Sequence, residues 1–243
     1  MIKFFIITII TIVSRKKSFV VAKKKKIMRW NIKKTTLILF LLLSFASSSQ
    51  YYKFDSVTRY SGKWRQQELE ILTYTNSEND NYYLRLSYYT NGWEAILYDL
   101  KNRKQHYFKV SEVKVKDGFS TIFKYYDTAV LHMTGHDIFS NYIFDFTTIE
   151  KKDNLKKVKL SVYKNSKRKK LIANYDLELR ENSTNLFPAF RVSCMHPYEF
   201  TSRLTLNENY IVVSSAAQFN VDGHVVQNRL IDYKEVDLIL QIP

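Results

Sequence analysis

The stretch YLRLSYYTNGWEAILYDL, residues 83–100, decides the fold of this chain. Its first half alternates apolar and polar side chains, with Leu84 and Leu86 on the apolar side. This period of two is typical of a strand that buries one face. The dipeptide Asn91-Gly92 accepts the positive φ values that a tight hairpin turn requires. The sequence therefore predicts an antiparallel hairpin of two strands, at 83–90 and 93–100.

The same alternation recurs outward from this hairpin. It is clearest in residues 158–162, 171–179 and 236–242. A second turn dipeptide, Asp222-Gly223, separates further strands, which we expect at 209–221 and 224–232. Strands with one solvent-exposed face are typical of antiparallel sheets, in which the other face packs on the core.

These patterns predict an all-β domain. We expect an antiparallel β-sandwich, or an open barrel-like sheet, of roughly nine to eleven strands that follows an N-terminal signal segment. A short helix could start at Pro197 and run to Arg203, because proline is tolerated in a first helical turn. A small outer-membrane β-barrel is a further alternative. Charged wet faces, uneven loops and the C-terminal Ile242-Pro243 in place of an aromatic strand end count against it.

The N-terminal region has the layout of a secretory signal. Met28 is followed by the cations Arg29, Lys33 and Lys34, then by an apolar run at 37–46 and the small residues Ser47-Ser48-Ser49. A cationic start, a short apolar middle and small residues at the cleavage site define a signal peptide, and the glutamine that follows resembles bacterial examples. We therefore expect three parts: 1–27 as a mis-called upstream extension, 28–49 as the signal peptide and 50–243 as a single all-β domain.

This division predicts export to the periplasm, the outer surface or the medium. The apolar runs at 4–13 and 37–46 are both shorter than the roughly 20 residues of a membrane-spanning helix. No transmembrane helix is therefore expected in the mature chain.

Most of the positive charge belongs to the leader. Of the 38 Lys and Arg residues, eleven fall within residues 1–49, which hold no acidic residue, so residues 50–243 carry 27 basic and 23 acidic groups and a net charge of +4. This small excess does not favour a nucleic-acid partner. The cations that remain cluster at 101–104, 151–157 and 164–170. Such runs are usually solvated turns, and the alternative is a patch for an anionic membrane or an acidic glycan.

Residues with catalytic chemistry are few. His132 and His136 are four apart, a spacing that would hold a metal on a helix, but Gly135 lies between them and the preceding segment is a predicted strand, so they are only weak candidates. Cys194 is the only cysteine, two residues before His196. We expect Cys194 to lie in an extended strand, with Phe190 and Val192 on the same side, and to pack as a small hydrophobe. No cofactor motif occurs, so no cofactor is expected.

The predicted hairpin also suggests a binding surface. If Leu84 and Leu86 face the core, Tyr83, Arg85 and Tyr89 face the opposite side of the sheet. The basic loop of Lys101, Arg103 and Lys104 would lie at one end of this surface. Tyrosine rings and cations together suit an anionic sugar or an acidic partner.

The predicted function is therefore that of an exported, non-catalytic interaction or glycan- and surface-binding module. Its partner would be an anionic glycan, a cell-surface component or a protein. The alternative is a small secreted hydrolase whose acid and base residues lie on separate strands.

Overall fold

The computed structural model describes residues 49–243, except 65–66, 90–91, 116–117, 133–135 and 221–222. The predicted signal segment and upstream extension lie outside the described residues. Eleven strands run through this part of the chain: β1 (Gln50–Trp64), β2 (Gln67–Asn76), β3 (Asn79–Tyr89), β4 (Gly92–Asp99), β5 (Lys104–Val115), β6 (Gly118–Val130), β7 (Ile143–Lys152), β8 (Leu155–Tyr163), β9 (Leu171–Glu181), β10 (Tyr210–Phe219) and β11 (Val225–Ile242).

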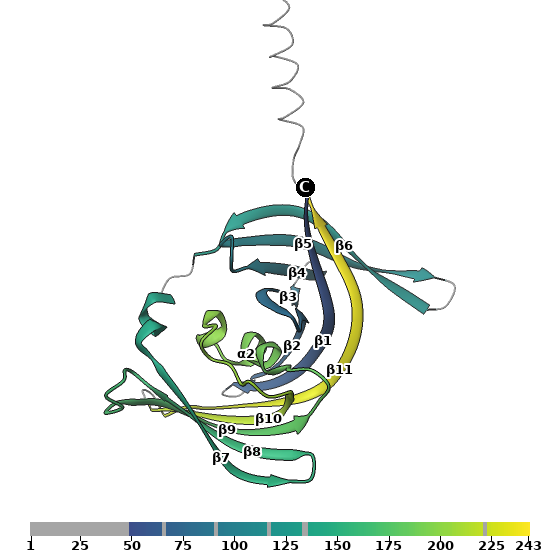
Figure 1. Ribbon diagram of the computed structural model, residues 1–243. Coiled ribbons are helices and arrows are strands. Elements are labelled where there is room, and N and C mark those ends of the chain that lie inside the picture. The colour runs from purple at the N-terminus through teal and green to yellow at the C-terminus, as the bar shows by residue number, and fades with distance from the viewer. Residues whose placement is uncertain (1–48, 65–66, 90–91, 116–117, 133–135, 221–222) are drawn as a thin grey trace, which may run out of the picture. The chain divides into compact units, whose positions relative to one another are not determined.

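All eleven strands belong to one sheet in the order β6-β5-β4-β3-β2-β1-β11-β10-β9-β8-β7 (Figure 1). Every strand therefore lies beside its neighbours in the chain, except that β6 and β7 form the two opposite edges and the last strand joins the first. The connection between β6 and β7 carries the short 3-10 helix η1 (His136–Asn141). The prediction of an all-β antiparallel domain is confirmed, and the open sheet is the architecture observed.

The glycines of the two turn dipeptides lie at the connections between consecutive strands of the sheet. Tyr89 pairs with Gly92 across β3 and β4, and Gly92 has a φ of 113°. Gly223 has a φ of 70° between β10 and β11. Glycine adopts such angles without the steric cost that a Cβ atom imposes. The segments predicted at 224–232 and 236–242 form one continuous strand, β11.

One core lies where the ends of the long strands meet the β3–β5 region. Tyr52 and Phe54 from the start of β1 and Ile242 from the end of β11 pack against Leu84 and Leu97. Tyr88 continues the alternation of Leu84 and Leu86 along β3, but it is 69% exposed and packs edge-to-face on Trp93.

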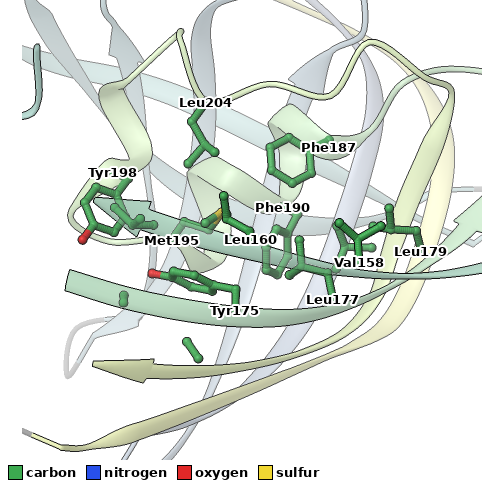
Figure 2. Close-up of a cluster of buried hydrophobic side chains, with 14 of the residues drawn as sticks. Val158, Leu160, Tyr175, Leu177, Leu179, Phe187, Phe190, Met195, Tyr198 and Leu204 are labelled. Atoms are coloured by element: carbon green, nitrogen blue, oxygen red, sulfur yellow. The ribbon is translucent and has the colours of Figure 1, made fainter. Parts of the chain in front are cut away.

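A second core lies between the sheet and the segment that joins β9 to β10. This segment contains helix α2 (Phe187–Cys194) and the 3-10 helix η2 (Tyr198–Phe200), and we call residues 187–200 the α2–η2 segment. It lies inside the curve of the sheet (Figure 1). Phe187, Phe190 and Met195 face Leu160 and Tyr175 of the sheet (Figure 2).

The prediction of a strand around Cys194 is wrong, because residues 187–194 are helical. Pro188 occupies the first turn, where its missing N–H costs no helical hydrogen bond, and the Asn185 side chain accepts a hydrogen bond from the Phe187 amide at 3.0 Å. The helix expected at 197–203 is reduced to η2. No helix among the described residues is long and apolar enough to span a membrane.

Candidate functional site

An apolar pocket of about 340 Å³ lies between the α2–η2 segment and the sheet. Its lining residues come from β1 and β2, from β9 to β11 with the β10–β11 turn, and from the α2–η2 segment: Gly62, Leu69, Ile71, Tyr175, Ser193, Cys194, His196, Pro197, Ala217, Phe219, His224, Val226 and Asn228. None of these side chains is a carboxylate, a lysine or an arginine. We call this cavity the α2 pocket.

The α2 pocket has a buried floor and an exposed mouth. Tyr175 and Ala217 are buried, whereas Leu69 and His196 are exposed to solvent. The Tyr175 hydroxyl has no hydrogen-bond partner among the described residues. Its ring packs edge-to-face on Phe219, and Phe219 stacks on His224 with ring centroids 4.7 Å apart. Aromatic rings therefore form one wall from the floor to the mouth.

A close approach between β1 and β11 forms another wall. A Cβ atom at Gly62 would lie 3.0 Å from Oδ1 of Asn228. The Asn228 amide donates a hydrogen bond of 3.1 Å to Ser215 Oγ, so it cannot move away without losing that bond. Glycine at position 62 is therefore required by the packing of this wall, because any larger side chain meets the Asn228 amide.

Two arginines, the partly buried Arg85 and the fully buried Arg191, hold the α2–η2 segment against the sheet. Arg85 of β3 forms an ion pair of 3.1 Å with Glu199 and also donates to the Val192 carbonyl. Arg191 lies on α2 and forms an ion pair of 3.0 Å with Asp80 of β3. Arg191 also donates to the Leu204 carbonyl at 3.1 Å. These contacts fix the cover of the α2 pocket at the C-terminal part of α2 and at η2.

His196 extends the first of these contacts to the pocket mouth. Its Nδ1 atom lies 3.4 Å from Glu199, and this hydrogen bond raises the pKa of His196. Burial raises the pKa of Glu199, but its contacts with His196 and Arg85 outweigh burial and leave that pKa below its usual value. Arg85, Glu199 and His196 therefore form a continuous chain of polar contacts from the sheet to the mouth.

Cys194 lines the α2 pocket and is partly exposed. Burial raises the pKa of its thiol far above neutrality. A nucleophilic cysteine needs a low pKa to form the thiolate. Cys194 lies at the end of a helix, so the extended geometry that would place Cys194 and His196 on one face does not occur.

The structure separates the residues of the predicted binding surface. Tyr83 is only 1% exposed and stacks on Tyr98, with 4.7 Å between ring centroids. Arg85 lies 5.5 Å from both ring centroids and pairs with Glu199. The expected exposure of Tyr83 is therefore wrong, because both faces of β3 are covered: one by the first core and the other by the α2–η2 segment.

The remaining predicted residues lie elsewhere. Lys101, Arg103 and Lys104 are exposed at the turn between β4 and β5, at the end of β3 that carries Tyr83. Tyr89 lies at the other end of β3, and its side chain is outside the described part of the structure. Binding by these residues stays a prediction.

The histidines considered as metal ligands do not form a described site. His132 is exposed after β6, and the side chain of His136 in η1 lies outside the described part of the structure. Among the residues that are described, no three His, Cys, Asp or Glu side chains are placed to hold one metal ion.

A larger hollow of about 680 Å³, lined by apolar and charged side chains, lies over β1, β2, β11 and β7 to β10. Asp176 and Glu178 line it from the face of β9 opposite to Tyr175, since successive residues of a strand alternate. Lys157 and Arg229 contribute positive charge to the same hollow. Its surface is open and of mixed charge, in contrast with the α2 pocket.

Comparisons with known proteins do not assign a family. No known family matches the sequence, and no characterised relative matches it. Among solved structures, a LolA superfamily protein from Nitrosomonas europaea has 12% identity and a TM-score of 0.28 over 76% of this chain and 87% of that one. A DUF1329 family protein from Desulfovibrio piger has 8% identity and a TM-score of 0.23 over 83% of this chain and 92% of that one. These values are too low to place the chain in either family.

Proposed function

We propose that the protein is an exported, non-catalytic binding protein that holds an apolar small molecule in the α2 pocket. The observation that carries this proposal is the lining of the pocket, which is almost entirely apolar and contains no Asp, Glu, Lys or Arg side chain. Apolar pockets with a few polar groups are the usual form of small-molecule sites.

The dimensions of the α2 pocket limit the ligand. Small-molecule pockets span about 300–1,000 Å³, and a volume of about 340 Å³ lies at the lower end of that range. A single acyl chain or a hydrocarbon of similar size is the class of ligand that this volume and lining favour. The unpaired hydroxyl of Tyr175 offers one polar contact to such a molecule.

Binding without catalysis agrees with the chemistry of the pocket. Burial raises the pKa of the Cys194 thiol, so the nucleophile that a Cys–His enzyme would need is protonated. His196 is bonded to Glu199, which is itself paired with Arg85. Export is supported by the signal-like pattern of residues 28–49.

A binding assay with a matched pair of variants tests the proposal. Val226 lines the α2 pocket, whereas its neighbour Val225 is exposed and lies on the other face of β11. The Val226→Trp variant fills the pocket and is expected to lose binding of the fluorescent apolar probe N-phenyl-1-naphthylamine. The Val225→Trp variant adds the same side chain outside the pocket and is expected to bind like the original protein.

Mass spectrometry of an organic extract of the purified protein would identify the ligand carried from the cell. Equal probe binding by the Val226→Trp variant and the original protein would exclude the α2 pocket as the site.

A further inference from the structure

One end of the sheet carries a concentrated positive charge. The connection between β8 and β9 contains Lys164, Lys167, Arg168, Lys169 and Lys170, all of them exposed. Arg203, which follows η2, lies beside this connection. We call these six residues the basic rim.

Arg203 and Lys164 come together at a polar pocket of about 410 Å³. Arg203 donates a hydrogen bond to the Ser140 carbonyl, which places its guanidinium at the edge of this pocket. The other lining residues are neutral, and none of them is Asp or Glu. A pocket with two cations and no carboxylate in its lining suits an anionic group such as a phosphate.

The basic rim is not neutralised by the protein itself. Arg168 is paired with Asp145 at 2.9 Å, but the four lysines form no ion pair with any described residue. The other large basic cluster differs, because its Lys151, Lys156 and Lys157 pair with Glu181, Glu208 and Glu150. The rim therefore keeps a local excess of positive charge, although residues 50–243 as a whole carry only +4.

The rim adjoins the mouth of the α2 pocket. Asn220, in the β10–β11 turn, bonds to the carbonyls of Leu171 and Ile172, which directly follow the rim in the chain. The same turn carries Phe219 and His224 of the pocket mouth. A flat anionic surface that contacts the rim would therefore lie close to the mouth.

We propose that the basic rim docks the protein on an anionic lipid bilayer. Several exposed lysines on one connection recognise a surface of many negative charges, and each cation near such a membrane increases binding by a factor of about five. The polar pocket lined by Lys164 and Arg203 receives a lipid phosphate, which fills only part of its volume of about 410 Å³. This interaction uses different residues from the α2 pocket and does not depend on it.

Vesicle sedimentation with two matched variants tests the proposal. The protein is mixed with vesicles of phosphatidylcholine alone, or of phosphatidylcholine with phosphatidylglycerol, with the same N-terminus in every variant. Binding is expected only to the anionic vesicles and is expected to weaken with added salt, since salt screens exposed charges. The triple variant Lys167→Gln/Lys169→Gln/Lys170→Gln is expected to bind at least about tenfold more weakly.

The control removes three positive charges from exposed positions on β1, β5 and β6, as Lys53→Gln/Lys114→Gln/Lys124→Gln, and is expected to keep its binding. Equal losses in the two triple variants would show that net charge alone attracts the protein, and would overturn the proposal. Absence of vesicle binding would overturn it as well. Binding to a soluble acidic polysaccharide in place of vesicles would identify a glycan as the partner of the rim.

Discussion

Arg85 links the sheet to the cover of the α2 pocket. It pairs with the buried Glu199, donates to the Val192 carbonyl and lies beside the stacked rings of Tyr83 and Tyr98. In the sequence this arginine alternates with leucines and was expected on an exposed face. The sequence predicts Arg85 as a surface contact, but in the structure Arg85 holds the α2–η2 segment in place.

Arg85→Met is expected to lower the free energy of unfolding by about 3 kcal/mol, because it leaves the carboxylate of Glu199 buried without its partner. Urea unfolding measures this loss. The exposed pair Arg59–Glu70 provides the control, and Arg59→Met is expected to cost less than about 1 kcal/mol. Equal costs in the two variants would contradict a structural role for the Arg85–Glu199 pair.

His106 gives the fold a dependence on pH. It is buried, its Nδ1 lies 2.6 Å from Thr128 Oγ1, and burial lowers the pKa of its imidazole below the usual 6.5. The unfolded chain therefore binds a proton more readily than the folded one. Stability from this group is complete above about pH 6.5 and is lost as the pH falls from there through the folded-state pKa.

The melting temperature is therefore expected to fall between about pH 7 and pH 5, and to fall less in His106→Gln, which cannot take up that proton. Thermal unfolding followed by circular dichroism across this range measures the difference. Parallel pH profiles of the two proteins would show that another group is responsible.

Cys194 is expected to react slowly with iodoacetamide near neutral pH, because burial raises the pKa of its thiol and little thiolate forms. The same thiol in urea should react at the rate of an ordinary cysteine. A bound apolar ligand should slow the reaction further, since Cys194 lines the α2 pocket. Rapid labelling of the native protein would show that the Cys194 thiol is reactive, and would favour a catalytic role for Cys194 and His196.

At the scale of elements, the sequence predicts hairpins well and the helix poorly. The strands of the 83–100 stretch and of 171–179 each show a period of two, and Gly92 and Gly223 mark the β3–β4 and β10–β11 turns by angles that few other residues adopt. Helix α2 has no such signal, because it is surrounded by the sheet and buries Arg191 together with Phe187 and Phe190. A helix buried on all sides has no polar face for a periodic pattern to reveal.

No local pattern in the sequence predicts the α2 pocket either. Its walls come from β1, β2, β9 to β11 and the α2–η2 segment, which only the folded sheet brings together. Cys194 and His196 are two residues apart in the sequence, but the pocket that they both line also needs Leu69 and Ala217 from distant strands. The sequence therefore draws attention to Cys194 and His196 but does not predict the α2 pocket that they line.

The contact between β1 and β11 depends on Gly62, which has no side chain. Gly62→Ala is expected to destabilise the protein by about 1 kcal/mol, because its Cβ atom would meet Asn228 Oδ1 at 3.0 Å. Chemical denaturation measures the change. Ser61→Ala, at the adjacent position, is expected to remain within about 0.5 kcal/mol of the original protein. A Gly62→Ala variant of unchanged stability would show that Asn228 moves freely.

For the whole molecule, an occupied pocket should stabilise the fold. A ligand that binds only the folded state adds about 2.7 kcal/mol when its concentration is a hundred times its dissociation constant. The melting temperature is then expected to rise by roughly 5–10 °C for a domain of this size. Val226→Trp should show no such rise, whereas Val225→Trp should show the full rise. A rise in both variants would place the ligand outside the α2 pocket.

The order of strands in the sheet has a consequence for the order of synthesis. β1 leaves the ribosome first, yet one of its two neighbours is β11, which leaves last. Until then one edge of β1 has no partner, and an unpaired edge can join another chain. The core around Tyr52 and Phe54 likewise stays incomplete until Leu240 and Ile242 have been synthesised. The nascent chain therefore cannot complete its sheet until β11 has been synthesised, and this delay agrees with the proposed export, in which the chain would cross a membrane before it folds.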